Sequence, residues 1–278
     1  MERIAVISDI HANLEATKTV LEDIKSRGIT KIICLGDIIA KGTHINECVE
    51  LIRENCFIVI SGNTDRHFST EHSDLSVFPE YEQNRIKWNQ SILTPENRYY
   101  LSQLPFCREL YMSGSLIRMF HATPEADNVP VLNVDTVETK SKMFEPTSKT
   151  ISQEVADVVI YGHIHHQYLD KLYNKTLINA GSVGSSFDAI RSNDFDSDLR
   201  ETTQAHYLII EGEYGKTEYG SGLGFQFVRV PYDIKKELSD VDKNLEPELH
   251  THELTTGMYQ DMKKIEQGFA DRGVKLRS

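Results

Sequence analysis

Seven residues that could bind a metal ion each lie just after an apolar, strand-like run of this chain. They are Asp9, His11, Asp37, Asn63, His121, His163 and His165. Asp9 and His11 follow the run 4–7, and residues i and i+2 of an extended segment point to the same side. A carboxylate oxygen and an imidazole nitrogen directed at one point suit a divalent cation. Taken alone, this pair is explained equally well by a helix cap and a loop histidine, so the other strand ends decide.

The remaining five donors occupy the same kind of position after later apolar runs. Asp37 follows 31–35, Asn63 follows 57–60 and His121 follows 116–120, while His163 and His165 follow 155–160. A cap, a loop turn or a satisfied core histidine would explain each one separately. All seven together predict one site at the carboxyl edge of a sheet, where open α/β sheets bind ligands. The donors include no thiolate, which favours manganese, iron or zinc.

The elements that must position these residues alternate between strands and helices at the start of the chain. A helix is predicted after the N-cap Asn13 and ends at Gly28. A second helix carries apolar residues at i, i+3, i+4 and i+7 between 45 and 52. With strands at 4–7, 31–35 and 57–60, this pattern predicts a parallel sheet with right-handed crossovers.

The rest of the chain predicts an insert, a second sheet and an extension. A helical insert is expected at about 66–104, with a loop at 66–76 and helices at 80–91 and 95–104. Further predicted elements are strands at 108–112, 116–120 and 155–160, a short helix at 137–144, and short β segments of an antiparallel second sheet at 168–173, 176–178, 206–211, 217–219 and 226–230. The polar segment 188–204 is expected to be a mobile loop. The expected domain spans 1–232, and 233–278 forms a C-terminal helical extension packed on it.

Composition narrows the class of function. The net charge of −12, from 30 basic and 42 acidic residues, argues against a nucleic-acid-binding surface. No stretch approaches the ~20 apolar residues of a membrane span, and the four cysteines show no paired spacing. These features predict a soluble, cytoplasmic protein without a membrane partner, and they are compatible with an oligomer. A small phosphate-bearing substrate fits, because a bound cation inverts the local sign of the field.

The motifs that these residues form resemble those of the calcineurin-like metallophosphoesterases. The matching stretches are Asp9-Ile10-His11, Gly36-Asp37, Gly62-Asn63-Thr64-Asp65, His121 and Gly162-His163-Ile164-His165. The segment 179–184 is similar to a turn of the small bacterial and archaeal branch. The segments 93–97 and 230–233 look like the branch that includes the diadenosine tetraphosphatases. The resemblance covers about 230 residues and leaves the C-terminal extension uncovered.

The resemblance implies an α/β fold, a two-layer mixed β-sandwich flanked by helices, with two metal ions about 3.5–4 Å apart. Manganese is the favoured metal, with iron or zinc as alternatives. By motif position, one ion is bound by Asp9, His11 and His165, the other by Asn63, His121 and His163, and Asp37 bridges them. Asp37, Asn63 and His163 also count as catalytic residues, because the reaction implied is in-line attack of a hydroxide that bridges the metals.

One position departs from the family pattern. Many relatives carry a histidine where this chain has Thr64, and threonine is a poor general acid. His67 and His166 are the nearest candidates to replace it. Alternatively, the substrate needs little acid help, because a nucleotide or phosphate leaving group has a second pKa of about 6 and departs without a proton.

Four side chains are candidate substrate contacts: Asn13, Thr64, Arg66 and His166. Asn13 is explained equally by helix capping, and Arg66 equally by solvation. The predicted function is hydrolysis of a phosphoanhydride or phosphodiester bond in a soluble nucleotide or polyphosphate, with diadenosine tetraphosphate favoured by the resemblance. The alternatives are a phosphodiesterase or phosphatase acting on a cyclic nucleotide or a phosphoprotein, and a non-catalytic scaffold with the same fold.

Overall fold

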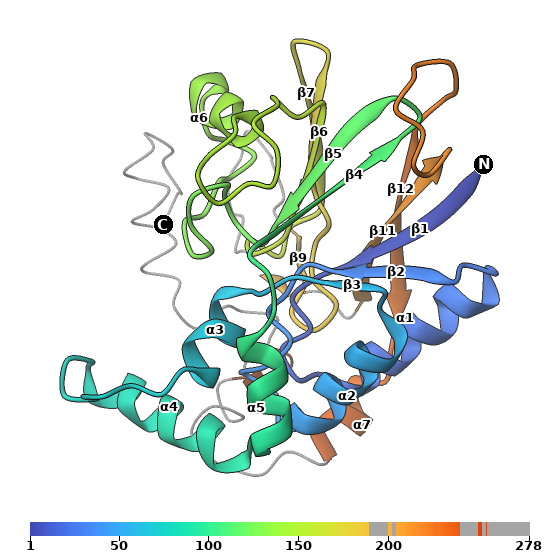
Figure 1. Cartoon of the computed structure of the whole chain (residues 1–278). Coiled ribbons are helices and arrows are strands. Elements are labelled where there is room, and N and C mark those ends of the chain that lie inside the picture. Colours follow the sequence, from blue (N-terminus) through green and yellow to red (C-terminus); the bar gives the residue numbers. More distant parts are fainter. Residues whose placement is uncertain (189–199, 202–203, 240–249, 252–253, 255–278) are drawn as a thin grey trace, which may run out of the picture.

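Two five-stranded mixed sheets pack face to face, with helices on their outer sides (Figure 1). The computed structural model describes residues 1–188, 200–201, 204–239, 250–251 and 254. The first sheet has the order β12-β11-β1-β2-β3 and the second β4-β5-β6-β8-β7. This is the predicted two-layer mixed sandwich flanked by helices, so the fold prediction is confirmed.

The strands are β1 (Glu2–Ile7), β2 (Lys31–Cys34), β3 (Ile58–Val59), β4 (Cys107–Met112), β5 (Ser115–Phe120), β6 (Val158–Tyr161), β7 (Tyr168–Leu172), β8 (Lys175–Asn179), β9 (Phe187–Asp188), β10 (Arg200–Glu201), β11 (Gln204–Gly212) and β12 (Gly224–Pro231). The helices are α1 (Leu14–Ser26), α2 (Ile45–Asn55), α3 (Asn63–Ser69), α4 (Glu80–Ile92), α5 (Pro95–Ser102), α6 (Val137–Ser141), the 3-10 turn η1 (Lys142–Phe144) and α7 (Ile234–Ser239).

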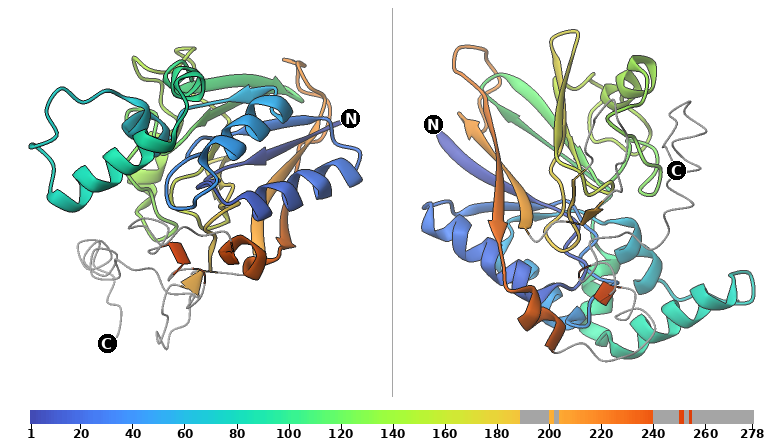
Figure 2. Two further views of the ribbon diagram at one scale, coloured as in Figure 1. Left: turned by 90° about the horizontal axis from the view of Figure 1, so that it is seen from below. Right: turned by 180° about the vertical axis from the view of Figure 1, so that it is seen from behind.

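Alternation along the strands divides the core into layers. Ile4 and Val6 of β1 face the second sheet, where they pack with Ile117 and Ile160. Ala5 lies on the other face of β1, in the cluster that contains the apolar stripes of α1 and α2. A third cluster packs the outer face of the second sheet against η1. The two turned views show the helices on the outer sides of the sandwich (Figure 2). The period of two therefore gives the central strands β11, β1 and β2 of the first sheet two buried faces, whereas the edge strand β12 is largely exposed.

The parallel connections bring the ligand-bearing strand ends to one edge. Strands β1, β2 and β3 are mutually parallel, as are β5, β6 and β8. The carboxyl ends of parallel strands meet at the same edge of a sheet. The loops after β1, β2, β5 and β6 therefore lie beside one another.

The structure corrects several predicted elements. The segments at 206–211 and 226–230 belong to the first sheet, as β11 beside β1 and β12 at the edge. No strand forms at 217–219, which lies in the connection between β11 and β12, and residues 66–69 are helical as part of α3. The helix predicted at 137–144 divides into α6 and η1.

Two predictions fall mostly outside the described residues. Of the segment 188–204, the structure describes only the ends, where β9 pairs with β10 and β11 begins. Of the extension 233–278, it describes α7 and residues 250, 251 and 254. Glu237 of α7 is fully buried and its carboxylate accepts a hydrogen bond from the backbone N–H of Glu15 on α1. The division into a domain, an insert and an extension stays a prediction. None of the described helices is long and apolar enough to cross a membrane.

His206 makes stability depend on pH. It is fully buried in β11, and burial lowers the pKa of its imidazole to about 3, with a smaller contribution from Arg229 on the paired strand. The unfolded chain takes up a proton near pH 6.5 and the folded chain does not, so stability falls as the pH drops from about 6.5 towards about 3. Between pH 7 and pH 5 the free energy of unfolding should fall by about 2 kcal/mol more in the wild type than in His206→Gln. Denaturant unfolding of both metal-stripped proteins measures this difference, and parallel losses would contradict it.

Candidate metal centre

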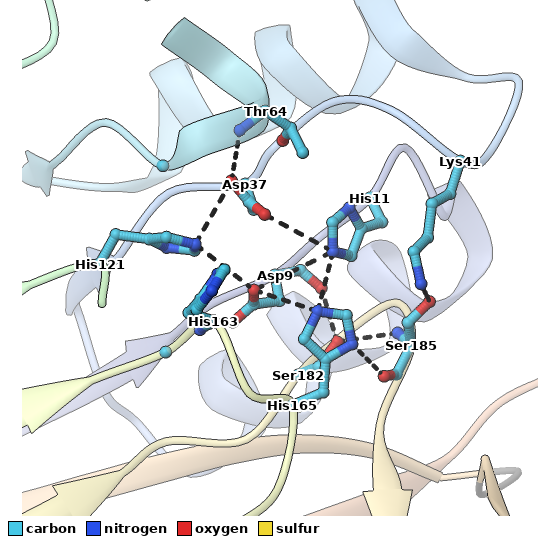
Figure 3. A network of polar contacts seen from close by, with 12 residues as sticks. Asp9, His11, Asp37, Lys41, Thr64, His121, His163, His165, Ser182 and Ser185 are labelled. Atoms are coloured by element: carbon cyan, nitrogen blue, oxygen red, sulfur yellow. Dashed lines mark hydrogen bonds and ion pairs between the residues drawn. The ribbon is translucent and has the colours of Figure 1, made fainter. Parts of the chain in front are cut away.

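Six of the seven predicted ligands form two compact groups at the common edge of the sheets. Asp9, His11 and His165 make the first cluster, and Asp37, His121 and His163 make the second; within each, the ligand atoms lie within 4.8 Å of one another. In the described part of the chain these are the only such groups. Figure 3 shows the side chains converging from loops of both sheets. Each cluster therefore takes ligands from both layers of the sandwich.

The backbone at these positions is in the left-handed region. The φ angles are 53° at Asp9, 50° at His11, 51° at Asp37, 68° at His163 and 58° at His165. A residue other than glycine at such a φ costs of order 1–3 kcal/mol and persists only where the surroundings impose it. Backbone hydrogen bonds from Asp9 to Gly36 and from His11 to Asp37 impose it here. Strain of this kind clusters at functional sites, and here it turns each ligand inward directly after its strand.

Three of the imidazoles are oriented by backbone carbonyls behind them. The Nδ1 atoms of His11, His121 and His165 lie 3.3, 2.8 and 2.6 Å from the carbonyl oxygens of Ile39, Leu35 and Ser185. With the proton on Nδ1, each ring donates to its carbonyl and presents the Nε2 lone pair to the centre. Metal-binding histidines in proteins commonly make such a hydrogen bond with the ring nitrogen that does not bind the metal.

The first cluster has the contacts of a cation site. Nε2 of His11 lies 3.0 Å from Nε2 of His165, so two lone pairs face each other at hydrogen-bonding distance. Oδ1 of Asp9 is fully buried, lies 3.3 Å from the same His165 nitrogen, and has no hydrogen-bond partner. A buried acceptor without a donor is costly. A divalent ion among these three atoms would satisfy all of them.

Asn63 completes the second cluster. One atom of its amide lies 3.0 Å from Nδ1 of His163 and 3.2 Å from Nε2 of His121. An amide oxygen at that position points to the same place as the facing nitrogen atoms of His163 and His121, as a metal ligand would. The residue types and their arrangement therefore fit two divalent ions.

Asp37 lies between the two clusters. Its Oδ1 is 3.4 Å from Nε2 of His121, and its Oδ2 is 3.8 Å from Nε2 of His11 (Figure 3). The backbone N–H of Thr64 at the start of α3 donates to Oδ1 at 2.9 Å. Each oxygen of this carboxylate therefore faces a histidine of a different cluster, which is the arrangement of a bridging ligand.

The electrostatics of the centre favour ionised carboxylates. Burial alone raises the pKa of Asp9, but His165 and His121 together outweigh burial and lower it to about 2. Burial also raises the pKa of Asp37, but the neighbouring histidines, His121 above all, outweigh burial and lower it. Burial lowers the pKa of His163 to about 4, whereas Asp37 outweighs burial at His121 and raises its pKa to about 10. Asp37 and Asp9 thus favour a positive charge at His121, where a bound divalent ion would take the place of the proton on Nε2.

The predicted substrate contacts Asn13, Thr64 and Arg66 all have partners within the protein. Asn13 is fully buried: its Oδ1 caps α1, and its Nδ2 donates to the Gly184 carbonyl and the Tyr232 hydroxyl, as the helix-capping interpretation expects. Arg66 is paired with Asp127. The hydroxyl of Thr64 donates to the Ile39 carbonyl at 3.1 Å, so its proton is used within the protein.

The two histidines proposed as acids lie in different surroundings. Nε2 of His67 is 2.8 Å from Glu82 of the insert, and its ring packs on Phe78. These contacts attach the His67 ring to the insert. The ring of His166 stacks on Tyr168, and its Nδ1 lies 3.3 Å from the Phe187 carbonyl.

Sequence reasoning missed two residues at the site. Lys41 follows Asp37 by four positions, and its ammonium donates to the Ser185 hydroxyl at 3.3 Å, behind His165 (Figure 3). Its charge contributes to lowering the pKa of His11, after burial and His165. The other is Asp65, which is fully buried and accepts from the backbone N–H groups of Ile38 and Gly62. A basic residue in the same loop as Asp37 was the available signal for Lys41.

Comparisons with known proteins agree with this geometry. Residues 2–194 match the calcineurin-like phosphoesterase superfamily domain. The chain is 36% identical to the uncharacterized protein MJ0912 of Methanocaldococcus jannaschii over 262 residues, which cover 88% of this chain and 94% of that protein.

Solved structures share the fold. A metallophosphoesterase from Sphaerobacter thermophilus has a TM-score of 0.64 at 23% identity, covering 92% of this chain and 100% of that one. The hypothetical protein PH1004 from Pyrococcus horikoshii has a TM-score of 0.68 at 18% identity, covering 91% and 98%. The domain match, which spans more than half of the chain, gives the assignment: the chain belongs to the calcineurin-like phosphoesterase superfamily.

Proposed function

We propose that this protein is a dinuclear-metal phosphoesterase that hydrolyses a phosphoanhydride or phosphodiester bond of a small nucleotide, with diadenosine tetraphosphate as the favoured substrate. The observation that carries the proposal is Asp37, whose two oxygens face one histidine in each cluster. A scaffold would have no need for a shared carboxylate between two sets of three ligands.

The residues of the site have different roles in the proposed reaction. Two divalent ions, manganese in the first instance, would supply an activated water and neutralise phosphoryl oxygens during in-line displacement. Asp9, His11 and His165 would hold one ion, and Asn63, His121 and His163 the other. The backbone N–H of Thr64 fixes the Asp37 carboxylate that both ions would share.

The surroundings of the candidate acids support the substrate class. Thr64 uses its proton on a backbone carbonyl, and His67 is engaged by Glu82. A leaving group that needs no proton therefore suits this site better than an alkyl alcohol. Phosphate and nucleotide leaving groups, with a second pKa of about 6, meet that condition.

A substrate panel tests the proposal. Metal-stripped protein reconstituted with Mn²⁺ is assayed on diadenosine tetraphosphate, a cyclic nucleotide, an activated aryl phosphodiester, a phosphoprotein and glycerol phosphate, and products are separated by chromatography. We expect metal-dependent turnover, fastest on the dinucleotide. Preference for glycerol phosphate would overturn the anhydride assignment. Turnover of none of the five in the presence of Mn²⁺ would favour a scaffold.

Lys41 is expected to bind a phosphate that is not attacked. Its ammonium lies at the first cluster, and a charge-assisted hydrogen bond to such a phosphate contributes equally to the ground and transition states. Lys41→Gln should raise KM for a nucleoside polyphosphate about tenfold, with kcat nearly unchanged. The exposed Lys171→Gln on β7 is the matched control. Steady-state kinetics decide the matter, and a loss confined to kcat would contradict the assignment.

A further inference from the structure

Arg66 and Asp127 form a two-pronged ion pair next to the second cluster. Nε of Arg66 lies 2.5 Å from Oδ2 of Asp127, and an Nη atom lies 2.7 Å from Oδ1. The Asp127 side chain is only 8% exposed, whereas that of Arg66 is 59% exposed. A fork-to-carboxylate contact fixes relative orientation as well as distance.

This pair connects the two segments that carry ligands of the second cluster. Arg66 is the fourth residue of α3, the short helix that begins with Asn63. Asp127 lies in the loop that begins at His121, directly after β5. Within that loop, Thr123 and Ala126 close a turn with two hydrogen bonds of 2.9 Å, so Asp127 is coupled to His121 through a short, ordered stretch.

The preceding residue on α3 makes the complementary connection. Asp65 accepts from the Ile38 N–H at 2.8 Å and ties the start of α3 to the loop of Asp37. Asp65 and Arg66 thus attach the same helix end to two different ligand loops.

We infer that the Arg66–Asp127 pair is a positioning device for the ion of the second cluster, because it holds Asn63 and His121 at a fixed separation. The inference rests on the proposed function only in taking the clusters to bind metal. Loss of Arg66 leaves the nearly buried carboxylate of Asp127 without its partner, so its loop must shift to reach water. Removing outer contacts of this kind lowers metal affinity about 10- to 100-fold in proteins.

Metal binding to the whole chain tests this inference without an activity assay. Metal-stripped wild type and Arg66→Gln are titrated with Mn²⁺ by calorimetry, and the electron paramagnetic resonance spectrum is recorded at two equivalents. We expect wild type to bind two ions and to show the signal of an exchange-coupled pair. In Arg66→Gln the Kd of one ion should rise about 10- to 100-fold while the other Kd is unchanged, and the coupled signal should fall.

Two further variants separate positioning from general stability. Arg53→Gln removes another ion pair, the 2.8 Å contact with Glu96 between α2 and α5, and should leave both Kd values unchanged. Arg66→Lys keeps the charge without the fork and should give an intermediate Kd. Equal weakening of both ions in Arg66→Gln, or none, would overturn the inference, as would a wild type that binds one ion. A wild type that binds two ions but hydrolyses none of the substrates refutes the proposed function alone.

Discussion

Alanine at position 37 should abolish metal-dependent hydrolysis. Asp37 is 3% exposed and stands between the clusters, so its removal takes a ligand from both ions at once. We expect activity below a few per cent of wild type, since even outer-layer contacts are worth about 10- to 100-fold. Initial rates on an activated aryl phosphodiester, together with elemental analysis of the purified variant, measure the effect.

The control for this variant is a carboxylate outside the centre. Asp74 lies in the insert, where its side chain accepts from the Ser76 N–H. Asp74→Ala should keep both its activity and its metal content. If Asp37→Ala retained more than a few per cent of activity with a full complement of metal, the bridging assignment would be wrong.

Gly62→Ala should be nearly as damaging, for a purely steric reason. A Cβ at Gly62 would stand 2.1 Å from Oδ1 of Asp37 and 2.2 Å from the backbone nitrogen of Asp37. The φ of Gly62 is −89°, which any residue adopts, so the substitution introduces a clash without backbone strain. The loop after β2 must move away from α3 to relieve it. We expect a stability loss of about 1–3 kcal/mol, and activity reduced by roughly 10- to 100-fold because the shared ligand is displaced.

Thermal unfolding and Mn²⁺ titration measure the two parts of that effect. Gly222→Ala is the matched control, because a Cβ there meets no atom within 4 Å. A Gly62→Ala protein with unchanged Mn²⁺ affinity would show that the Asp37 carboxylate tolerates displacement, contrary to its role as a shared ligand.

The ligand positions could be predicted from sequence because each is fixed by a local rule. A polar residue that directly follows a buried parallel strand lies at the carboxyl edge of the sheet, whatever the rest of the chain does. Asp9, His11, Asp37, His121 and His163 all meet that condition, and the structure brings them together. Their left-handed backbone is a consequence of the turn and leaves no mark in the residue types.

Roles and placements that depend on a distant partner could not be predicted from the sequence. Arg66 looked available to a phosphate because its partner, Asp127, lies 61 positions away along the chain. Asn13 has the residue type of both a helix cap and an anion contact, and only the Gly184 and Tyr232 contacts decide between them. The placement of β11 in the first sheet likewise depends on pairing with β1 across some 200 residues, which local alternation does not encode.

The derivation of each cluster from both sheets has a consequence for the order of assembly. In the first cluster, Asp9 and His11 follow β1 while His165 follows β6; in the second, Asp37 follows β2 while His121 follows β5. Neither sheet alone presents the full ligand set of either ion. High-affinity metal binding therefore requires that the two sheets have packed together. The bound ions then stabilise the packed arrangement against separation of the sheets. Added Mn²⁺ should slow unfolding and leave early folding steps unchanged, because a ligand that binds only the native state stabilises that state.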